Sequence, residues 1–131
     1  MKVLFEKSQI ENRIKEIGVQ ILNRHKEENN PIVLIGVLNG GFMFYSKLVD
    51  QLALLDPQCD FIRVKSYKGR EHEVPEIIIP SSLSVKNKFV YIVDDIYDTG
   101  LTMEALKNQF TDLGANGVSV VTLIKRAINE V

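Results

Sequence analysis

Acidic and hydroxyl side chains are concentrated in the sequence Val-Asp-Asp-Ile-Tyr-Asp-Thr-Gly-Leu-Thr, which covers residues 93–102. Asp94 and Asp95 follow a continuously apolar segment. Carboxylates at such a position can accept hydrogen bonds from sugar hydroxyls or hold a hydrated Mg²⁺. Asp98 comes three residues after Asp95, where its carboxylate could accept a proton from a base or a nucleophile. The segment therefore offers both polar binding groups and a candidate acid–base group.

The second half of this segment, Thr99 to Thr102, leads into a helical pattern. Successive backbone N–H groups and two hydroxyls at a helix N-terminus suit a phosphate monoester, and Gly100 lets the backbone approach the anion closely. Taken alone, three aspartates near a glycine are typical of a solvated turn, and Thr102 is also a good N-cap. The buried strand before the turn and the patterned helix after it favour a phosphate site. No Walker sequence with its lysine occurs, which excludes a P-loop NTPase.

The segments that must position these residues alternate between strand and helix patterns. Strands are expected at 2–5, 32–38, 61–65, 76–79, 89–93 and 118–124, and helices at 8–28, 42–55 and 102–113. Residues 32–38 and 89–93 lack polar alternation, which is typical of parallel strands covered on both faces. We therefore expect an α/β fold with a mostly parallel twisted sheet and helices on both faces. Ligands of such sheets bind at the carboxyl ends of the strands, where residues 94–102 fall.

Composition limits the classes of protein that the chain can belong to. Its 131 residues predict one domain over residues 1–131, and the net charge of −1 makes nucleic acid an unlikely partner class. The apolar runs are too short to span a membrane or to serve as a signal peptide. Cys59 is the one cysteine, so a reducing, cytoplasmic location is expected.

Local patterns predict the environment of several other residues. The spacing of Ser8 and Glu11 is that of a capping box at the start of the first helix. Cys59 is expected to be a buried or half-buried structural thiol, and both His25 and His72 are expected to be solvated. The residues expected to pack in the core or at a subunit interface are Phe42, Phe44 and Tyr45, and those expected on the buried face of the first helix are Ile10, Ile14, Ile17 and Ile21.

The segment at 93–102 resembles the phosphoribosyl-diphosphate binding motif of the type I phosphoribosyltransferases. Three further stretches, at 36–41, 60–67 and 121–126, resemble the diphosphate loop, the strand leading to the active-site lid and the purine-reading strand of the hypoxanthine-guanine (6-oxopurine) branch. Their order and spacing match over nearly the whole chain. The resemblance implies a type I phosphoribosyltransferase core with a reduced hood.

The resemblance also implies roles for the residues that follow the last long apolar segment. The 5′-phosphate is expected on Thr99, Gly100, Leu101 and Thr102, and the ribose hydroxyls at Asp94 and Asp95. The same two aspartates are expected to hold Mg²⁺ directly or through water. Asp98 is expected to face purine N7 and to act as the general base.

Roles follow for the other strand ends as well. Asn39, Gly40 and Lys65 are expected to bind the diphosphate, and Ser66 with Tyr67 to close over the site as a lid. Lys125 is expected to donate a hydrogen bond to the 6-oxo group of the purine. Pairing of Lys125 with the aspartate cluster, as a simple strand-end cation, explains this residue about equally well.

The function implied is Mg²⁺-dependent transfer of the 5-phosphoribosyl group to hypoxanthine, guanine or xanthine in purine salvage, by a homodimer or homotetramer. Asn39 stands where the branch commonly has lysine, the lid after Tyr67 is shorter, and the branch continues beyond Arg126. These differences favour the alternative of a non-catalytic or truncated domain that binds phosphoribosyl diphosphate or a nucleotide. A phospho-acceptor receiver domain is a third, weaker interpretation. The acidic pair of that fold follows an early strand, whereas Asp94 and Asp95 follow a late one.

Overall fold

The computed structural model describes residues 6–26, 31–38, 42–65, 76–80, 82–97 and 100–125. The elements in chain order are α1 (Lys7–Arg24), β1 (Ile32–Leu38), α2 (Phe42–Gln51), the short 3₁₀ helix η1 (Ala53–Leu55), β2 (Gln58–Lys65), β3 (Glu76–Ile78), β4 (Phe89–Tyr97), α3 (Gly100–Asp112) and β5 (Gly117–Lys125). The strand expected at 2–5 lies outside the described residues.

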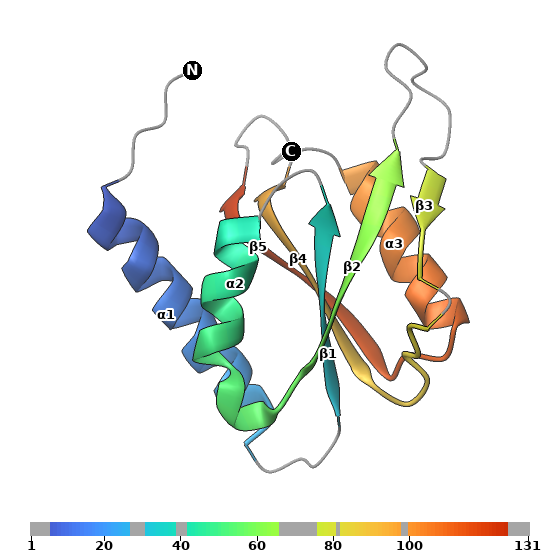
Figure 1. The fold of residues 1–131 in the computed structure, drawn as a ribbon, viewed down its shortest axis with the longest axis horizontal. Helices are drawn as coiled ribbons and strands as arrows, with labels where there is room; N and C mark the ends of the chain where they lie inside the picture. Colours follow the sequence, from blue (N-terminus) through green and yellow to red (C-terminus); the bar gives the residue numbers. More distant parts are fainter. Residues whose placement is uncertain are drawn as a thin grey trace.

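The five described strands form one sheet in the order β3-β2-β1-β4-β5. β1 pairs in parallel with both β2 and β4, and β4 pairs in parallel with β5. Only β3, at one edge, is antiparallel to its neighbour β2. Helices α1 and α2 cover one face of the sheet and α3 covers the other (Figure 1). The expected α/β architecture is therefore confirmed.

Side chains of the central strands enter two hydrophobic cores, one on each face of the sheet. Ile32 and Leu34 of β1 pack with α1 and α2, whereas Val33 and Ile35 pack in the cluster that includes Leu106 of α3. Successive residues of a strand face opposite sides, so a strand covered on both faces has to be apolar at every position. This alternation explains the unbroken apolar run of β1.

The first helix buries the face predicted for it but begins at a different residue. Ile14, Ile17 and Ile21 are buried and Ile10 packs against their cluster, as expected. The helix begins at Lys7, after Glu6 in an extended conformation, and the Glu6 N–H donates to Gln9 Oε1 at 2.9 Å. The prediction of a Ser8–Glu11 capping box was therefore wrong, and the helix ends at Arg24 rather than at residue 28.

Two predicted environments are also corrected. His25 is only 3% exposed, and its Nε2 lies 2.6 Å from the Tyr91 hydroxyl, because position 25 falls one turn after Ile21 on the buried stripe. Cys59 is exposed, because it lies at the second residue of β2, at the amino-terminal edge of the sheet.

Phe44 and Tyr45 are buried in the core as expected. His72 and the side chain of Phe42 are outside the described residues. Within the described part of the chain, no helix combines the length and hydropathy needed to cross a membrane.

Candidate active site

Four strands end at the same edge of the sheet because β1, β2, β4 and β5 run parallel to one another. Their last residues are Leu38, Lys65, Tyr97 and Lys125. Each of the four sequence stretches selected for its chemistry lies at or directly after one of these ends. The topology thus brings the ends of strands that are up to 87 residues apart in the chain (Leu38 and Lys125) to one carboxyl edge, where parallel sheets bind ligands.

The acidic pair lies within β4 rather than after it. The prediction ended this strand at residue 93, but β4 continues to Tyr97 because its ladder with β5 continues. Asp94 is paired with Thr122, and Tyr97 with Lys125. Asp94 is partly buried. Its partial exposure allows a charged side chain at this position of the strand, which the apolar pattern alone does not indicate.

The helix that follows begins three residues after this strand ends. α3 starts at Gly100 instead of the expected residue 102, so Gly100, Leu101 and Thr102 form its first turn. The first four N–H groups of a helix have no partner inside the helix, and the helix dipole adds positive potential there. The strand with the carboxylates and an anion-attracting helix terminus are therefore neighbours. Asp98 and Thr99, which connect them, lie outside the described residues.

The other proposed ligand-binding residues fall into two groups. Lys65 ends β2 and Lys125 ends β5, so the backbone places both at the carboxyl edge. Asn39, Gly40, Ser66 and Tyr67 lie outside the described residues. Within the described residues, no group of three or more histidine, cysteine, aspartate or glutamate side chains is arranged to hold a metal ion.

The packing beneath this edge depends on Gly36, which sequence reasoning did not single out as a packing residue. A Cβ atom at this position would lie 2.6 Å from Cε1 of Phe61 and 3.0 Å from Cδ2 of Tyr45. The two rings pack against each other with centroids 4.7 Å apart. Gly36 is therefore required so that the rings of β2 and α2 can lie directly on β1, two residues before that strand ends. A glycine within an otherwise apolar strand was the available signal.

Tyr45 also joins α2 to the sheet by a hydrogen bond. Its hydroxyl donates to the carbonyl oxygen of Leu34 at 2.8 Å, and a second carbonyl, that of Asp60, lies at 3.4 Å. Burial is the main cause that raises the pKa of Tyr45 above its ordinary value, and the nearby Cys59 adds to the effect. The neutral hydroxyl is therefore the form that the fold favours.

Comparison with known proteins agrees with this architecture. The family described as "Phosphoribosyl transferase domain" matches residues 4–131. The chain therefore belongs to the phosphoribosyl transferase domain family, and its fold is the type I phosphoribosyltransferase core that the sequence predicted.

The curated relatives carry a more specific name. A hypoxanthine-guanine phosphoribosyltransferase of Lactococcus lactis is 36% identical over 127 residues, which are 95% of this chain and 67% of the relative. The Staphylococcus aureus protein of the same name is 32% identical over 127 residues, or 95% of this chain and 69% of the relative. Among solved structures, the hypoxanthine phosphoribosyltransferase of Trypanosoma cruzi in complex with its product IMP superposes with a TM-score of 0.83. It is 30% identical, and the match covers 98% of this chain and 72% of that one.

Proposed function

We propose that this chain is a purine salvage phosphoribosyltransferase. It would transfer the 5-phosphoribosyl group of phosphoribosyl diphosphate to hypoxanthine, guanine or xanthine and release diphosphate. The observation that carries the proposal is the junction of β4 and α3, where a strand with two carboxylates in its second half is followed three residues later by a helix N-terminus. Membership of the family and the names of the relatives support it.

The sugar phosphate would bind at this junction. The backbone N–H groups of Thr99, Gly100, Leu101 and Thr102, with the two threonine hydroxyls, would hold the 5′-phosphate. Asp94 and Asp95 would accept hydrogen bonds from the ribose hydroxyls. The diphosphate would be held by the backbone of Asn39 and Gly40 and by Lys65 at the end of β2, which parallels β1. Each of these groups belongs to a segment that ends at or follows the carboxyl edge.

The purine would bind across the same edge. In the transfer step, a bond forms between a purine ring nitrogen and the anomeric carbon, while the bond from that carbon to diphosphate breaks and its electrons leave with the diphosphate oxygen. Asp98 would accept the proton that the purine loses. Lys125 would donate to the 6-oxo group, and Ser66 with Tyr67 would exclude water from the reactive sugar. An amino substituent cannot accept that hydrogen bond, so oxopurines would be preferred.

Mg²⁺ is the cofactor that this chemistry implies. Asp94 is partly exposed in the second half of its strand, and carboxylate oxygens are ligands of the kind that Mg²⁺ prefers, so the residues present fit the ion. Asp94 and Asp95 would hold it, directly or through water. When bound, the ion would supply positive charge that neutralises the leaving diphosphate. We also propose that the protein is cytoplasmic and that it forms a homodimer or homotetramer. Sedimentation of the purified protein tests the oligomeric state.

The experiment that tests the function compares three proteins for formation of inosine monophosphate from phosphoribosyl diphosphate, Mg²⁺ and hypoxanthine. The wild type should turn over, and Asp98→Asn should lose about 10²–10⁴-fold in kcat while still binding phosphoribosyl diphosphate. Asp112→Asn, the same change at the far end of α3, should keep its activity. Unchanged turnover in Asp98→Asn would remove Asp98 from the role of base.

A second function is favoured by Asn39, which replaces a positive charge in the diphosphate loop by a neutral amide. In that case the chain would bind phosphoribosyl diphosphate or a nucleotide without transfer. Calorimetric titration with phosphoribosyl diphosphate and Mg²⁺, alongside the turnover assay, separates the two functions. Binding without any product would identify the non-catalytic form, and product formation would exclude it.

A further inference from the structure

Two turns meet at the amino-terminal edge of the sheet, opposite the candidate active site. One turn precedes β4 and contains Asn87, and the other joins α3 to β5 and contains Asn116. The Asn87 N–H donates to the carbonyl oxygen of Gly114 at 2.9 Å, and the Asn116 N–H donates to the carbonyl oxygen of Lys88 at 2.8 Å. The proposed reaction gives these turns no role.

The side chain of Asn116 completes the contact between the two turns. Its Nδ2 donates to the carbonyl oxygen of Asn87 at 3.1 Å, and the residue is exposed to solvent. In the part of the chain that the structure describes, the Asn116 side chain makes this one hydrogen bond. The amide is thus held at the surface by a single bond between neutral groups.

The residue after Asn116 has to be glycine. A Cβ atom at Gly117 would lie 2.5 Å from Cε2 and 2.8 Å from Cδ2 of Phe89, and real Cβ atoms essentially never approach other atoms so closely. The Phe89 ring cannot easily move away, because it packs against His25 and Tyr91 with ring centroids 5.1 Å and 4.9 Å apart. Packing therefore fixes a glycine directly after an exposed asparagine.

An asparagine followed by glycine can react with the next peptide bond of its own chain. The nitrogen of Gly117 attacks Cγ of Asn116, and a new C–N bond closes a five-membered succinimide. The side-chain NH₂ leaves with the amide proton of Gly117 as ammonia. Water then breaks one of the two C–N bonds of the ring, which gives aspartate or isoaspartate. Asparagine is among the thermolabile residues, and glycine has no Cβ to crowd the attacking nitrogen.

The native structure offers this reaction little resistance. Gly117 is the first residue of β5, and the ends of elements open more readily than their centres. Freeing the Asn116 amide breaks a hydrogen bond between neutral groups, which slows the attack by about tenfold at most. The reactive arrangement is therefore accessible without unfolding of the domain.

We propose that Asn116 is a deamidation site, at which the folded protein converts spontaneously to isoaspartate or aspartate and loosens the start of β5. The product has no Nδ2 donor and sets a carboxylate beside the carbonyl oxygen of Asn87, where two acceptors repel each other. Isoaspartate also adds a methylene group to the main chain, directly before the residue pair Phe89–Gly117 of the β4–β5 ladder.

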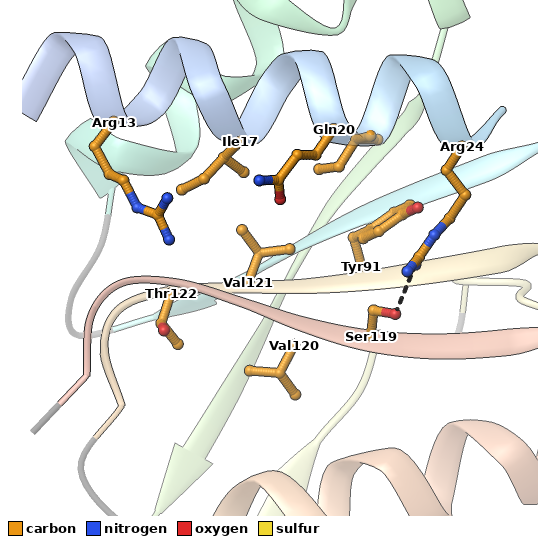
Figure 2. A pocket seen from close by; sticks show the side chains of 10 residues that line it. Arg13, Ile17, Gln20, Arg24, Tyr91, Ser119, Val120, Val121 and Thr122 are labelled. Atoms are coloured by element: carbon orange, nitrogen blue, oxygen red, sulfur yellow. Dashed lines mark hydrogen bonds between the residues drawn. The ribbon is translucent and has the colours of Figure 1, made fainter. Parts of the chain in front are cut away.

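The change should stay local because β5 is anchored two residues after Gly117. Arg24 of α1 donates to Ser119 Oγ at 3.1 Å (Figure 2), and its guanidinium lies 5.5 Å from the centroid of the Phe89 ring. Residues 117 and 118 should therefore loosen, whereas residues 119–125 should not. The candidate site at the other end of the strand is spared, so the proposal does not depend on the proposed function.

The first test follows the purified full chain during incubation at pH 8. Anion exchange separates the products, because each conversion adds one negative charge to the formal net charge of −1, and peptide mapping by mass spectrometry assigns the residue. Asn116 should convert faster than Asn12 and Asn108, which are also exposed but precede larger residues. The mapping also separates Asn116 from Asn39, which likewise precedes a glycine. Conversion of Asn116 no faster than that of Asn12 and Asn108 would overturn the proposal.

Variants test the structural consequence. Asn116→Asp, which reproduces the aspartate product, should lower the Tm by about 2–4 °C and speed amide exchange at residues 117 and 118 about tenfold. The control Asn12→Asp adds the same charge at an exposed position of α1 and should change neither quantity. An unchanged Tm and unchanged exchange in Asn116→Asp, or faster exchange throughout residues 119–125, would contradict the local loosening of β5.

Discussion

Substitution of Gly36 by alanine should destabilise the protein through a steric conflict that can be worked out from the structure. The added methyl carbon would lie 2.6 Å and 2.7 Å from two ring carbons of Phe61, and 3.0 Å from Tyr45. Contacts under 3.0 Å essentially never occur for real Cβ atoms, so one of the rings has to move. Because the two rings pack against each other and belong to α2 and β2, the displacement reaches both elements.

Overpacking of this kind costs about 1–3 kcal/mol, and replacing a strand glycine returns at most about 1 kcal/mol of chain entropy. The net loss should therefore be about 1–2 kcal/mol in the free energy of unfolding. For a chain of this size, about 4 °C in Tm corresponds to each kcal/mol. Urea denaturation followed by circular dichroism should show the midpoint falling at an unchanged slope.

A double-mutant cycle identifies the cause. Phe61→Leu alone should be destabilising, because it removes part of a ring that packs against the core. In the Gly36→Ala background the same change should cost less, since the shorter side chain makes room for the methyl group. A coupling of at least about 0.5 kcal/mol of this sign is expected. Additive effects, or an alanine variant as stable as the wild type, would refute the steric account.

Three further results are expected. Tyr91→Phe should lower the free energy of unfolding by about 1–3 kcal/mol, because it removes the hydroxyl that lies 2.6 Å from buried His25 Nε2; a loss below the error of thermal denaturation would contradict this contact. Burial raises the pKa of Tyr45, so the neutral hydroxyl stabilises the fold below the ordinary tyrosine pKa and this contribution is lost as pH rises above it. Urea midpoints measured from pH 9 to 11 should fall less steeply in Tyr45→Phe, and parallel curves would contradict the assignment. Thr99→Ala with Thr102→Ala should weaken binding of inosine monophosphate by at least about tenfold in a calorimetric titration, and unchanged affinity would mean that the phosphate turn is misassigned.

The layered fold was predictable because β1 and the first part of β4, residues 89–93, carry no charged residue and no polar alternation. Because Ile32 to Leu38 is apolar toward both faces of the sheet, each face needs a covering layer of helices. This favours a parallel sheet between two helix layers over a fold of two layers. The same pattern predicted that the strands share one carboxyl edge, because parallel strands end at the same side of the sheet. For that reason the sequence located the candidate site before any geometry was known, although the functions of its residues stay proposals.

Element boundaries and single-residue environments were harder to predict because neighbouring strands decide them. β4 continues through Asp94 and Asp95 because its pairing with β5 continues, a contact between residues about 28 positions apart. His25 has no local partner in the sequence, and its buried contact is with Tyr91, 66 positions away. Cys59 is exposed because of where β2 begins. Gly36 could be noticed as a glycine within a strand, but the rings that require it come from α2 and β2.

The most direct test of the central claim measures nucleotide formation by the purified chain. Phosphoribosyl diphosphate and Mg²⁺ are supplied with hypoxanthine, guanine, xanthine or adenine in parallel, and nucleoside monophosphates and diphosphate are quantified. We expect equal amounts of diphosphate and nucleotide with one or more of the oxopurines and neither product with adenine. Absence of product with every base would contradict the assignment as a transferase, and turnover of adenine at the rate of an oxopurine would contradict the role proposed for Lys125.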